Sequence, residues 1–377
     1  MGSEIIVVIV VATALVFDFT NGFHDTANVV ATSISTRAMP PRVAVGYAAI
    51  LNFVGAFISL EVAATVANDV VSVQANSIGL LAVFSGLVGA IAWNLITWYF
   101  GLPSSSSHAL IGGMVGAVFV AEGPDNVFFA EGILGKVMIP AIVAPVLAFL
   151  VGGLTIVFLY RIVGRLRPGP VTGGFRLGQV ISGGMLALAH GTNDAQKTMG
   201  VITLALVANG TLTEAEFHVP DWVVVSAATA IALGTYVGGW RIIKTMGSRI
   251  HKMDAAQGFA AQGSGATVIL AASHVGFPLS TTHTISGAVI GSGAAKRLSA
   301  VRWGVAGNIV VAWILTLPAA ALIGGLTYLV TRLFGTGAAG PIIVSTAILI
   351  GSAILFARRS REGAAPGVVP ATGSSPP

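Results

Sequence analysis

Two short segments place charged and polar side chains inside long apolar stretches of the sequence. Residues 21–28 read NGFHDTAN and residues 190–197 read HGTNDAQK, and apolar residues flank both segments on each side. A charged side chain at the centre of a bilayer costs about 2.5–3.5 kcal/mol on insertion scales, so Asp25 and Asp194 should face a protein cavity and have partners there. The alternative, a loop near the membrane interface, fits the long apolar flanks less well. We expect the helix to be interrupted within both segments.

These segments also carry hard ligands for a small cation. The carboxylates of Asp25 and Asp194, together with neighbouring asparagine amides, suit Na⁺, and the carboxylates also suit a proton. The residues predicted to bind the coupling ion, H⁺ or Na⁺, are Asn21, Asp25, Asn193 and Asp194. Lys197, one helical turn after Asp194, either balances that charge or attracts an anion.

Two clusters rich in hydroxyl side chains interrupt two further apolar regions. They read GLPSSSSH at residues 101–108 and GFPLSTTH at residues 276–283. In each, the proline ends the preceding helical arm, and the hydroxyls can cap the helix that follows. A helix N-terminus offers free N–H groups and a positive dipole end, which together with hydroxyl donors can bind a tetrahedral oxyanion. Capping alone is the alternative, but it uses only one or two hydroxyls per tip. The predicted anion ligands are Ser105, Ser106, Ser107, Ser280, Thr281 and Thr282.

Two histidines, His108 and His283, directly follow these clusters. Their matching positions make them candidate proton or anion contacts, although a single histidine more often hydrogen-bonds a neighbouring backbone group. His24 and His190 have no matching counterpart and are weaker candidates than His108 and His283. Asp18 and Glu61 have no acidic counterpart in the other half and receive no role. No HExxH or similar spacing supports a metal site, so we predict no metal beyond a Na⁺ and no cofactor.

The composition indicates a polytopic membrane protein. Of the 377 residues, 55% are hydrophobic and 9% are charged, whereas a soluble protein carries about 25% charged residues. Cysteine is absent, which excludes thiolate metal sites and cysteine nucleophiles. The net charge of +5 reflects basic loops on one side of a membrane, and we expect no nucleic-acid partner. We predict an integral, multi-pass protein of the cell membrane in contact with lipid.

Hydropathy predicts full spans and two interrupted regions. The full spans lie near residues 5–32, 44–66, 136–163, 177–208, 222–245, 303–330 and 341–357. The interrupted regions, residues 79–121 and 258–295, contain the hydroxyl clusters, and the arm after each cluster is short for a full crossing. We interpret each interrupted region as a re-entrant hairpin.

The motifs recur in pairs, which indicates an internal duplication. Asp25 aligns with Asp194 and His108 with His283, in the same order and with nearly equal spacing. Basic residues follow the first motif but precede the second, so the positive-inside rule gives the two copies opposite orientations. Inverted repeats with broken helices are typical of secondary transporters that work by alternating access, with the site near the membrane midplane. The predicted fold class is an all-α polytopic membrane protein with an inverted-topology repeat, broken helices and two re-entrant hairpins.

The predicted organisation follows from this duplication. It comprises a first inverted repeat at residues 1–165, a cytoplasmic linker at 166–176, a second inverted repeat at 177–335, an extra transmembrane helix at 336–357 and a disordered cytoplasmic tail at 358–377. The linker and the tail are assigned to the cytoplasm because both contain arginines.

At the paired motifs the sequence resembles the inorganic phosphate transporter (PiT) family. GFHDTANV and HGTNDAQK are similar to the two copies of its GxNDxAN-type motif, and GLPSSSSHALIGG and GFPLSTTHTISGA to its G-x-P-x-S-T-T-H-x-I-x-G-A elements. The resemblance covers roughly residues 10–330. It implies a symporter of inorganic phosphate driven by H⁺ or Na⁺, and it allows a homo-oligomer.

The resemblance also implies roles for individual residues. By motif match, the phosphate and cation sites would be lined by Asp25, Asn28, Asp194 and Lys197, with Ser105, Ser106, Ser107, Ser280, Thr281 and Thr282. Asn28 and Lys197 join the hydroxyls as phosphate ligands. The first motif departs from the family pattern in having His24 where the second has Asn193, and this departure leaves the identity of the coupling ion open.

Other functions remain open from the residues alone. Sulfate is also tetrahedral, and relatives of the family include sulfate permeases, so sulfate is the alternative substrate. An intramembrane hydrolase using a serine and His108 needs one nucleophile and one base, whereas this sequence carries the same constellation twice in opposite orientation. An ion channel is less consistent with two-sided, broken-helix symmetry. We therefore predict a transporter and not an enzyme.

Overall fold

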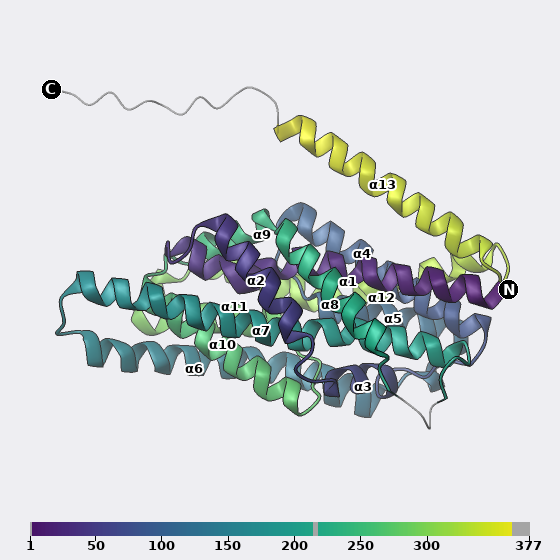
Figure 1. Cartoon of the computed structure of the whole chain (residues 1–377), viewed down its shortest axis with the longest axis horizontal. Coiled ribbons are helices and arrows are strands. Elements are labelled where there is room, and N and C mark those ends of the chain that lie inside the picture. The colour runs from purple at the N-terminus through teal and green to yellow at the C-terminus, as the bar shows by residue number, and fades with distance from the viewer. Residues whose placement is uncertain (1, 214–217, 364–377) are drawn as a thin grey trace.

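The computed structural model describes residues 2–213 and 218–363, and within these ranges the chain folds as a bundle of long helices (Figure 1). The helices are α1 (Gly2–Ser35), α2 (Pro41–Gly55), α3 (Glu61–Asn68), α4 (Ser77–Phe100), α5 (Ser106–Glu122), α6 (Ile139–Val163), α7 (Pro168–Ala208), α8 (Asp221–Val237), α9 (Trp240–Lys244), α10 (Ala255–His274), α11 (Thr281–Lys296), α12 (Trp303–Arg332) and α13 (Ala339–Gly363). Two segments are π-helical: Phe129–Met138 directly precedes α6, and Thr245–Arg249 directly follows α9. Short 3-10 turns occupy Pro124–Asn126 and Leu298–Ala300.

Four helical stretches in the described ranges are each long and apolar enough to cross a membrane. They are Glu4–Ser35, Ser77–Phe100, Phe129–Val163 and Trp303–Arg332. Helix α8 is also long and apolar enough when it is taken together with α9 and the π-helical segment after it, and the two parts of this pair are bent by 59° relative to each other. Helices of this length and hydropathy support the predicted multi-pass membrane protein.

Two of the predicted spans are broken. The first is shared by α2 and α3, and the second by α8 and α9. Gly238 ends α8 with a φ of 74°, a conformation that favours glycine. The loop of a hairpin packs near each break, because Gly276 lies beside Glu61 and Gly101 lies beside Arg241. Hydropathy averaged over a window does not detect such breaks, since the residues around them are themselves apolar.

The interruptions expected at residues 21–28 and 190–197 are not there, and this expectation was wrong. Both α1 and α7 run through these motifs as continuous α-helix. The motif side chains find polar partners in the hairpin tips, so the backbone keeps its helical hydrogen bonds. The breaks lie instead in α2–α3, in α8–α9 and at the hairpin tips.

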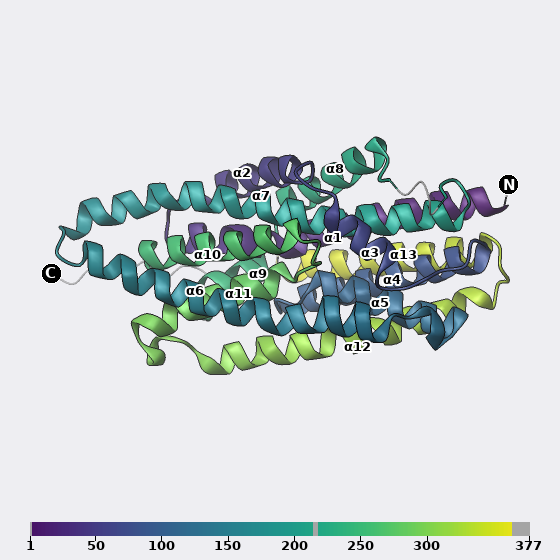
Figure 2. The same cartoon turned by 90° about the horizontal axis from the view of Figure 1, so that it is seen from below.

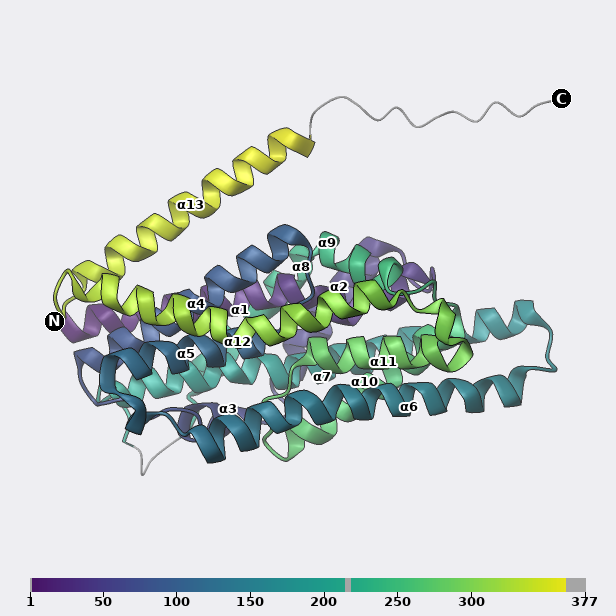
Figure 3. The same ribbon diagram turned by 180° about the vertical axis from the view of Figure 1, so that it is seen from behind.

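The ends of the predicted segments also differ from expectation. Most of the linker predicted at residues 166–176 is helical, because α7 begins at Pro168. The predicted extra transmembrane helix corresponds to α13, which stands apart from the bundle in Figures 1 and 3. Of the predicted tail, residues 358–363 belong to α13, and residues 364–377 lie outside the described residues.

The two hairpins approach each other from opposite ends of the bundle. The α4–α5 hairpin lies toward the end that holds the N-terminus, and the α10–α11 hairpin lies toward the other end (Figures 1 and 2). The arms after the tips, α5 and α11, have 17 and 16 residues, which is short for a full span. Ser107 Oγ donates a hydrogen bond to Leu279 O at 3.1 Å, so the two tips touch. This arrangement agrees with the predicted inverted repeat and two re-entrant hairpins.

Glycines let each short arm pack closely on a long helix. On α5, Gly116 lies against the backbone carbonyl of Ala321 in α12, and on α11, Gly291 lies against that of Phe149 in α6. The glycine four residues earlier on each arm makes the equivalent contact one turn away. Such small-residue stripes let helix backbones approach closely in a membrane. The two contacts correspond between the halves of the chain, as an internal duplication requires.

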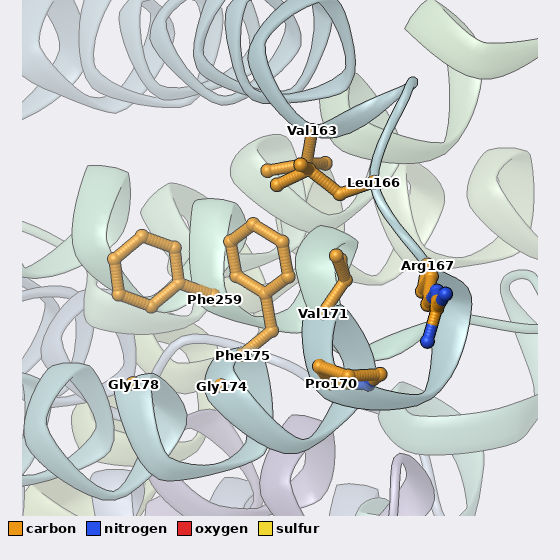
Figure 4. A pocket seen from close by; sticks show the side chains of 9 residues that line it. All are labelled: Val163, Leu166, Arg167, Pro170, Val171, Gly174, Phe175, Gly178 and Phe259. Carbon is orange, nitrogen blue, oxygen red and sulfur yellow. The ribbon is translucent and has the colours of Figure 1, made fainter.

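An apolar cavity of about 530 Å³ lies where α6 turns into α7. Figure 4 shows the rings of Phe175 and Phe259 beside each other in this cavity, and Arg167 is the one charged residue that lines it. None of the predicted ion or anion ligands lines the cavity. The candidate site therefore lies elsewhere, at the hairpin tips.

The close glycine contacts give a testable consequence for stability. Gly116→Ala and Gly291→Ala should each destabilise the protein by about 1–3 kcal/mol, because the added methyl group meets backbone that cannot rotate away. Thermal unfolding in detergent measures the effect. Gly263→Ala, a helical position with open space around it, is the matched control and should unfold no earlier than the wild type, because alanine is a better helix former than glycine. Equal unfolding temperatures for all three variants would contradict the packing described here.

Candidate functional site

The two charged motifs and the two hairpin tips meet in one buried cluster between the halves. The motifs come from α1 and α7, and the hydroxyl clusters from the starts of α5 and α11. Every predicted site residue has an exposed fraction of 4% or less. These residues are Asn21, Asp25, Asn28, Ser105, Ser106, Ser107, His108, Asn193, Asp194, Lys197, Ser280, Thr281, Thr282 and His283.

One hydroxyl of each cluster caps a helix. Ser105 Oγ accepts a hydrogen bond from the backbone N–H of His108 at 3.1 Å, and Ser280 Oγ accepts one from that of His283 at 3.2 Å. Both serines have the extended backbone usual for an N-cap residue. Capping therefore accounts for one hydroxyl per tip, and the next two hydroxyls of each tip have other partners.

Asp25 is held by hydroxyls from both hairpins. Ser106 Oγ donates to Asp25 Oδ2 at 2.7 Å, and the Oγ1 atoms of Thr281 and Thr282 lie 3.4 Å from the same carboxylate. His24 Nδ1 lies 2.7 Å from Asp25 Oδ1, which is ion-pair distance. The carboxylate thus has the protein partners that its position in an apolar helix requires.

Asp194 is paired with a lysine and a histidine. Lys197 Nζ donates to Asp194 Oδ1, to Ser107 Oγ at 2.6 Å and to Leu279 O at 2.7 Å. His190 Nε2 lies 3.1 Å from Asp194 Oδ2. Lys197 therefore balances the charge of Asp194 and also connects α7 to the tips of both hairpins.

Matching residues of the two motifs reach across to the opposite half. Asn28 Nδ2 donates to Thr282 Oγ1 at 2.9 Å, and Lys197, at the position that matches Asn28, donates to Ser107. Each side chain comes from one half of the chain and contacts the hairpin of the other half. The site thus has approximate two-fold symmetry that is broken by a charge at one position.

The two aspartates come close enough to share partners. Thr281 Oγ1 lies 3.2 Å from Asp194 Oδ2 as well as near Asp25, so one hydroxyl bridges the two carboxylates. One ligand atom from each of Asp25, His190 and Asp194 lies within 4.8 Å of the others. Hard cations prefer oxygen ligands, so the two carboxylates have the chemistry that a small cation needs.

Further oxygens near these motifs lack protein partners. Asn193 Nδ2 donates to Ser273 Oγ at 2.7 Å, but the Oδ1 atoms of Asn193 and Asn21 are buried without a hydrogen bond in the described part of the chain. Asp18, three residues before Asn21 on α1, is fully buried, and neither of its carboxylate oxygens makes a hydrogen bond of ordinary geometry there. Buried oxygens of this kind are costly unless a cation or water satisfies them.

The imidazole rings of His108 and His283 turn toward each other. Their centroids are 4.6 Å apart at an interplanar angle of 78°, and His283 also stacks on Trp313 with a centroid distance of 4.0 Å. Only their backbone N–H groups are tied to the hydroxyl clusters. A proton or anion contact by the two rings stays a prediction.

Sequence reasoning ranked His24 and His190 low and gave Asp18 no role, yet the structure places all three at the site. The two histidines were set aside because they lack matching counterparts, yet each contacts an aspartate from a non-matching position. The spacing could have indicated the contact between His190 and Asp194, since residues four positions apart share a helix face. Asp18 and Asn21 share a face of α1 for the same reason.

The charges of the cluster do not balance when His24, His190 and Asp18 are neutral. Asp25 and Asp194 carry two negative charges against the single positive charge of Lys197, and all three are nearly fully buried. An anion placed among the hydroxyls would therefore add to an existing excess of negative charge. Charges of like sign in a buried site repel strongly unless cations accompany them.

Comparisons with known proteins agree with the geometry. The sequence pattern described as "Phosphate transporter family" matches residues 21–324. A protein of Mycobacterium leprae named "Probable low-affinity inorganic phosphate transporter" is 50% identical over 95% of this chain and 85% of its own length. One of Bacillus subtilis with the same name is 42% identical over 87% of this chain and 98% of its own length.

A solved structure shares the fold. The chain described as "The sodium-dependent phosphate transporter" is similar with a TM-score of 0.78 at 25% identity, over 87% of this chain and 99% of that one. The relatives are named as transporters, which confirms the prediction that this protein is not an enzyme. The all-helical, multi-pass membrane fold is confirmed as well. With both halves, both hairpins and both motifs in place, the chain belongs to the phosphate transporter family.

Proposed function

We propose that this protein takes up inorganic phosphate by symport with a cation, using alternating access between its two inverted halves. Family membership supports phosphate as the substrate. The relatives and the structural neighbour are also named as phosphate transporters, and the neighbour's name adds that its transport depends on sodium. The coupling cation is H⁺ or Na⁺.

The observation that carries the symport proposal is the excess negative charge of the buried cluster. Two aspartates face one lysine between the hairpin tips. A phosphate anion that enters alone meets uncompensated carboxylates at low dielectric, which is strongly unfavourable. A cation that enters with phosphate removes this repulsion, so binding of the two ions is coupled through the site itself.

The hydroxyl and amide donors around the carboxylates supply the anion ligands. Ser106 and Thr281 donate to Asp25 in the present arrangement, and the same hydroxyls can turn to phosphate oxygens once a cation or proton occupies the carboxylate. Lys197 and the N-termini of α5 and α11 add positive potential. Protonated phosphate can itself donate to a carboxylate, whereas sulfate at neutral pH cannot, and this difference favours phosphate over sulfate.

The two candidate cations would use different side chains. A proton would reside on the pairs that His24 makes with Asp25 and that His190 makes with Asp194, because a ring nitrogen and a carboxylate oxygen lie 2.7 and 3.1 Å apart in these pairs. A Na⁺ ion would need oxygen ligands, and the unpartnered oxygens of Asp18 and neighbouring Asn21 meet that need. Substitutions in these two sets of residues should therefore distinguish H⁺ from Na⁺ as the coupling cation.

Removing either aspartate charge should abolish coupled uptake. Asp25→Asn and Asp194→Asn should each lower cation-driven phosphate uptake at least about 30-fold, because each removes a carboxylate that the cation is proposed to neutralise, and truncating one partner of a buried charge pair costs about 2–5 kcal/mol. Uptake of radiolabelled phosphate into proteoliposomes measures the loss. Asp69→Asn, a half-exposed carboxylate paired with Lys136, is the matched control and should transport normally. Wild-type uptake by a folded Asp25 or Asp194 variant would refute that residue's role.

Removing a donor hydroxyl should weaken phosphate binding without changing the cation dependence of uptake. Ser106→Ala and Thr281→Ala should each raise the KM for phosphate about tenfold, because a hydrogen bond to a charged group is worth about 1.5–3 kcal/mol. The cation dependence of uptake should stay the same. Ser85→Ala, whose hydroxyl bonds only within α4, is the control. A changed cation dependence with an unchanged KM would show that these hydroxyls serve the cation instead.

Imposed gradients should identify the cation and its ligands together. Proteoliposomes are given either a pH gradient without Na⁺ or a Na⁺ gradient at fixed pH, with excess sulfate as competitor in both. If H⁺ drives uptake, His24→Asn should reduce it strongly and Asp18→Asn weakly. If Na⁺ drives uptake, the order should reverse. Uptake driven by neither gradient would contradict symport, and strong inhibition by sulfate would contradict the choice of phosphate.

A further inference from the structure

A small basic pocket lies where the end of α4 meets the segment that follows the break between α8 and α9. The pocket has a volume of about 250 Å³. Both halves of the chain contribute to it, because one wall comes from the end of α4 and the other from α9 and the π-helical segment. Three of the described residues that line it are positively charged and none is negatively charged. The lining residues are Phe100, Gly101, Arg241, Lys244, Thr245 and Arg249.

Two of these cations have no protein partner in the part of the chain that the structure describes. The side chains of Lys244 and Arg249 are exposed and make neither a hydrogen bond nor an ion pair there. Arg241 Nη1 donates to Tyr99 O at 3.0 Å, so this guanidinium caps the C-terminal end of α4 with one of its five N–H groups. The pocket therefore keeps positive charge and hydrogen-bond donors for an anionic group such as phosphate.

An apolar groove of about 390 Å³ adjoins the basic pocket. Phe100 lines both hollows and is 66% exposed. The groove lies between α4 and α12, which pack on each other (Figure 3). Residues at helical spacing on one face of each helix line it, so the groove runs along the helices. Its other lining residues are Trp93, Ile96, Thr97, Leu102, Asn308, Val311, Ala312 and Leu315, none of which is charged.

The pocket and the groove meet near the cytoplasmic surface of the membrane. The positive-inside rule assigns the basic residues after the break to the cytoplasmic side. Trp240 and Trp303 begin α9 and α12 and are 48% and 51% exposed, and exposed tryptophans are typical of the membrane–water interface. Anionic lipids lie in the cytoplasmic leaflet, and basic pockets between helices on this side suit their head groups.

We propose that this site binds an anionic phospholipid, with the lipid phosphate in the basic pocket and one acyl chain in the groove beside Phe100. A free phosphate ion would occupy only the pocket, and a neutral lipid would leave Lys244 and Arg249 without a counter-ion. A zwitterionic head group would bring its own cation toward three positive charges, which repel it. None of the lining residues belongs to the predicted ion or anion ligands, so the lipid site is separate from the transport site.

Photolabelling of the full chain in phosphatidylcholine nanodiscs tests the proposal. The probe is phosphatidylglycerol with a diazirine in one acyl chain, and the competitors are unlabelled phosphatidylglycerol and phosphatidylethanolamine. Labels should fall at residues 93–102 and 308–315. Phosphatidylglycerol should compete about tenfold better than phosphatidylethanolamine, because only its head group has a net negative charge. No ion gradient is imposed, so the result does not depend on the proposed symport.

Charge variants test the pocket. Lys244→Gln and Arg249→Gln should each raise the mole fraction of probe needed for half-maximal labelling about fivefold, because each removes one cation beside an anionic lipid. Arg165→Gln removes an exposed cation of the α6–α7 turn outside the pocket and should label like the wild type. Arg241 is left unchanged because it caps α4.

Shape variants test the groove. Val311→Trp fills the groove and should abolish labelling, whereas Leu322→Trp, 64% exposed on α12 but outside the groove, should not. Equal competition by the two lipids, or unchanged labelling in both charge variants, would overturn the proposal. Cross-links through the groove to a second copy of the chain would also overturn it. So would inorganic phosphate that displaces the probe equally from the wild type and from Asp25→Asn, because the pocket would then take the free ion.

Discussion

The arrangement of the site depends on the hydrogen bonds that the buried ammonium group of Lys197 donates. It donates to Asp194 on its own helix, to Ser107 on one hairpin and to Leu279 O on the other. A buried charge with incomplete partners is several kcal/mol less stable than a paired one. Three acceptors from three elements therefore converge on Lys197, and the two hairpin tips are held together at α7. Because the partners are hydroxyl, carbonyl and carboxylate oxygens, they can exchange for ligand oxygens without leaving the lysine unpaired.

Close backbone packing makes this convergence possible. The tips meet only because α5 and α11 lie almost against the backbones of α12 and α6, where Gly116 and Gly291 leave no side chain between the helices. Each short arm thus packs on its supporting helix through close backbone contacts, whereas hydrogen bonds join the two tips to each other. The proposed alternating access would use this difference, since packed cores do not deform continuously but hydrogen bonds can be exchanged.

The sequence predicted the parts of the fold that depend on local patterns, and it failed where tertiary contacts decide. Hydroxyl clusters after proline predicted the hairpin tips and their caps, because capping is a local interaction. The motif around Asp25 was wrongly expected to unwind, since its polar residues look like a helix break until Ser106 and Thr281 are known to satisfy them. The contacts of His24 and His190 with the aspartates were missed because internal symmetry was taken as the guide to function, and these two positions break that symmetry.

The broken symmetry itself has a physical consequence. Asn28 and Lys197 occupy matching positions and make matching contacts with the opposite hairpin, but only one of them is charged. With lysine at both positions the cluster would be neutral, and an anion would need no companion. With asparagine at both, nothing would offset the two carboxylates, and an anion would be strongly repelled. With Asp18 and the histidines neutral, a single lysine leaves one excess negative charge, which one cation would neutralise. In the proposed symport, this asymmetry favours entry of the anion together with a cation.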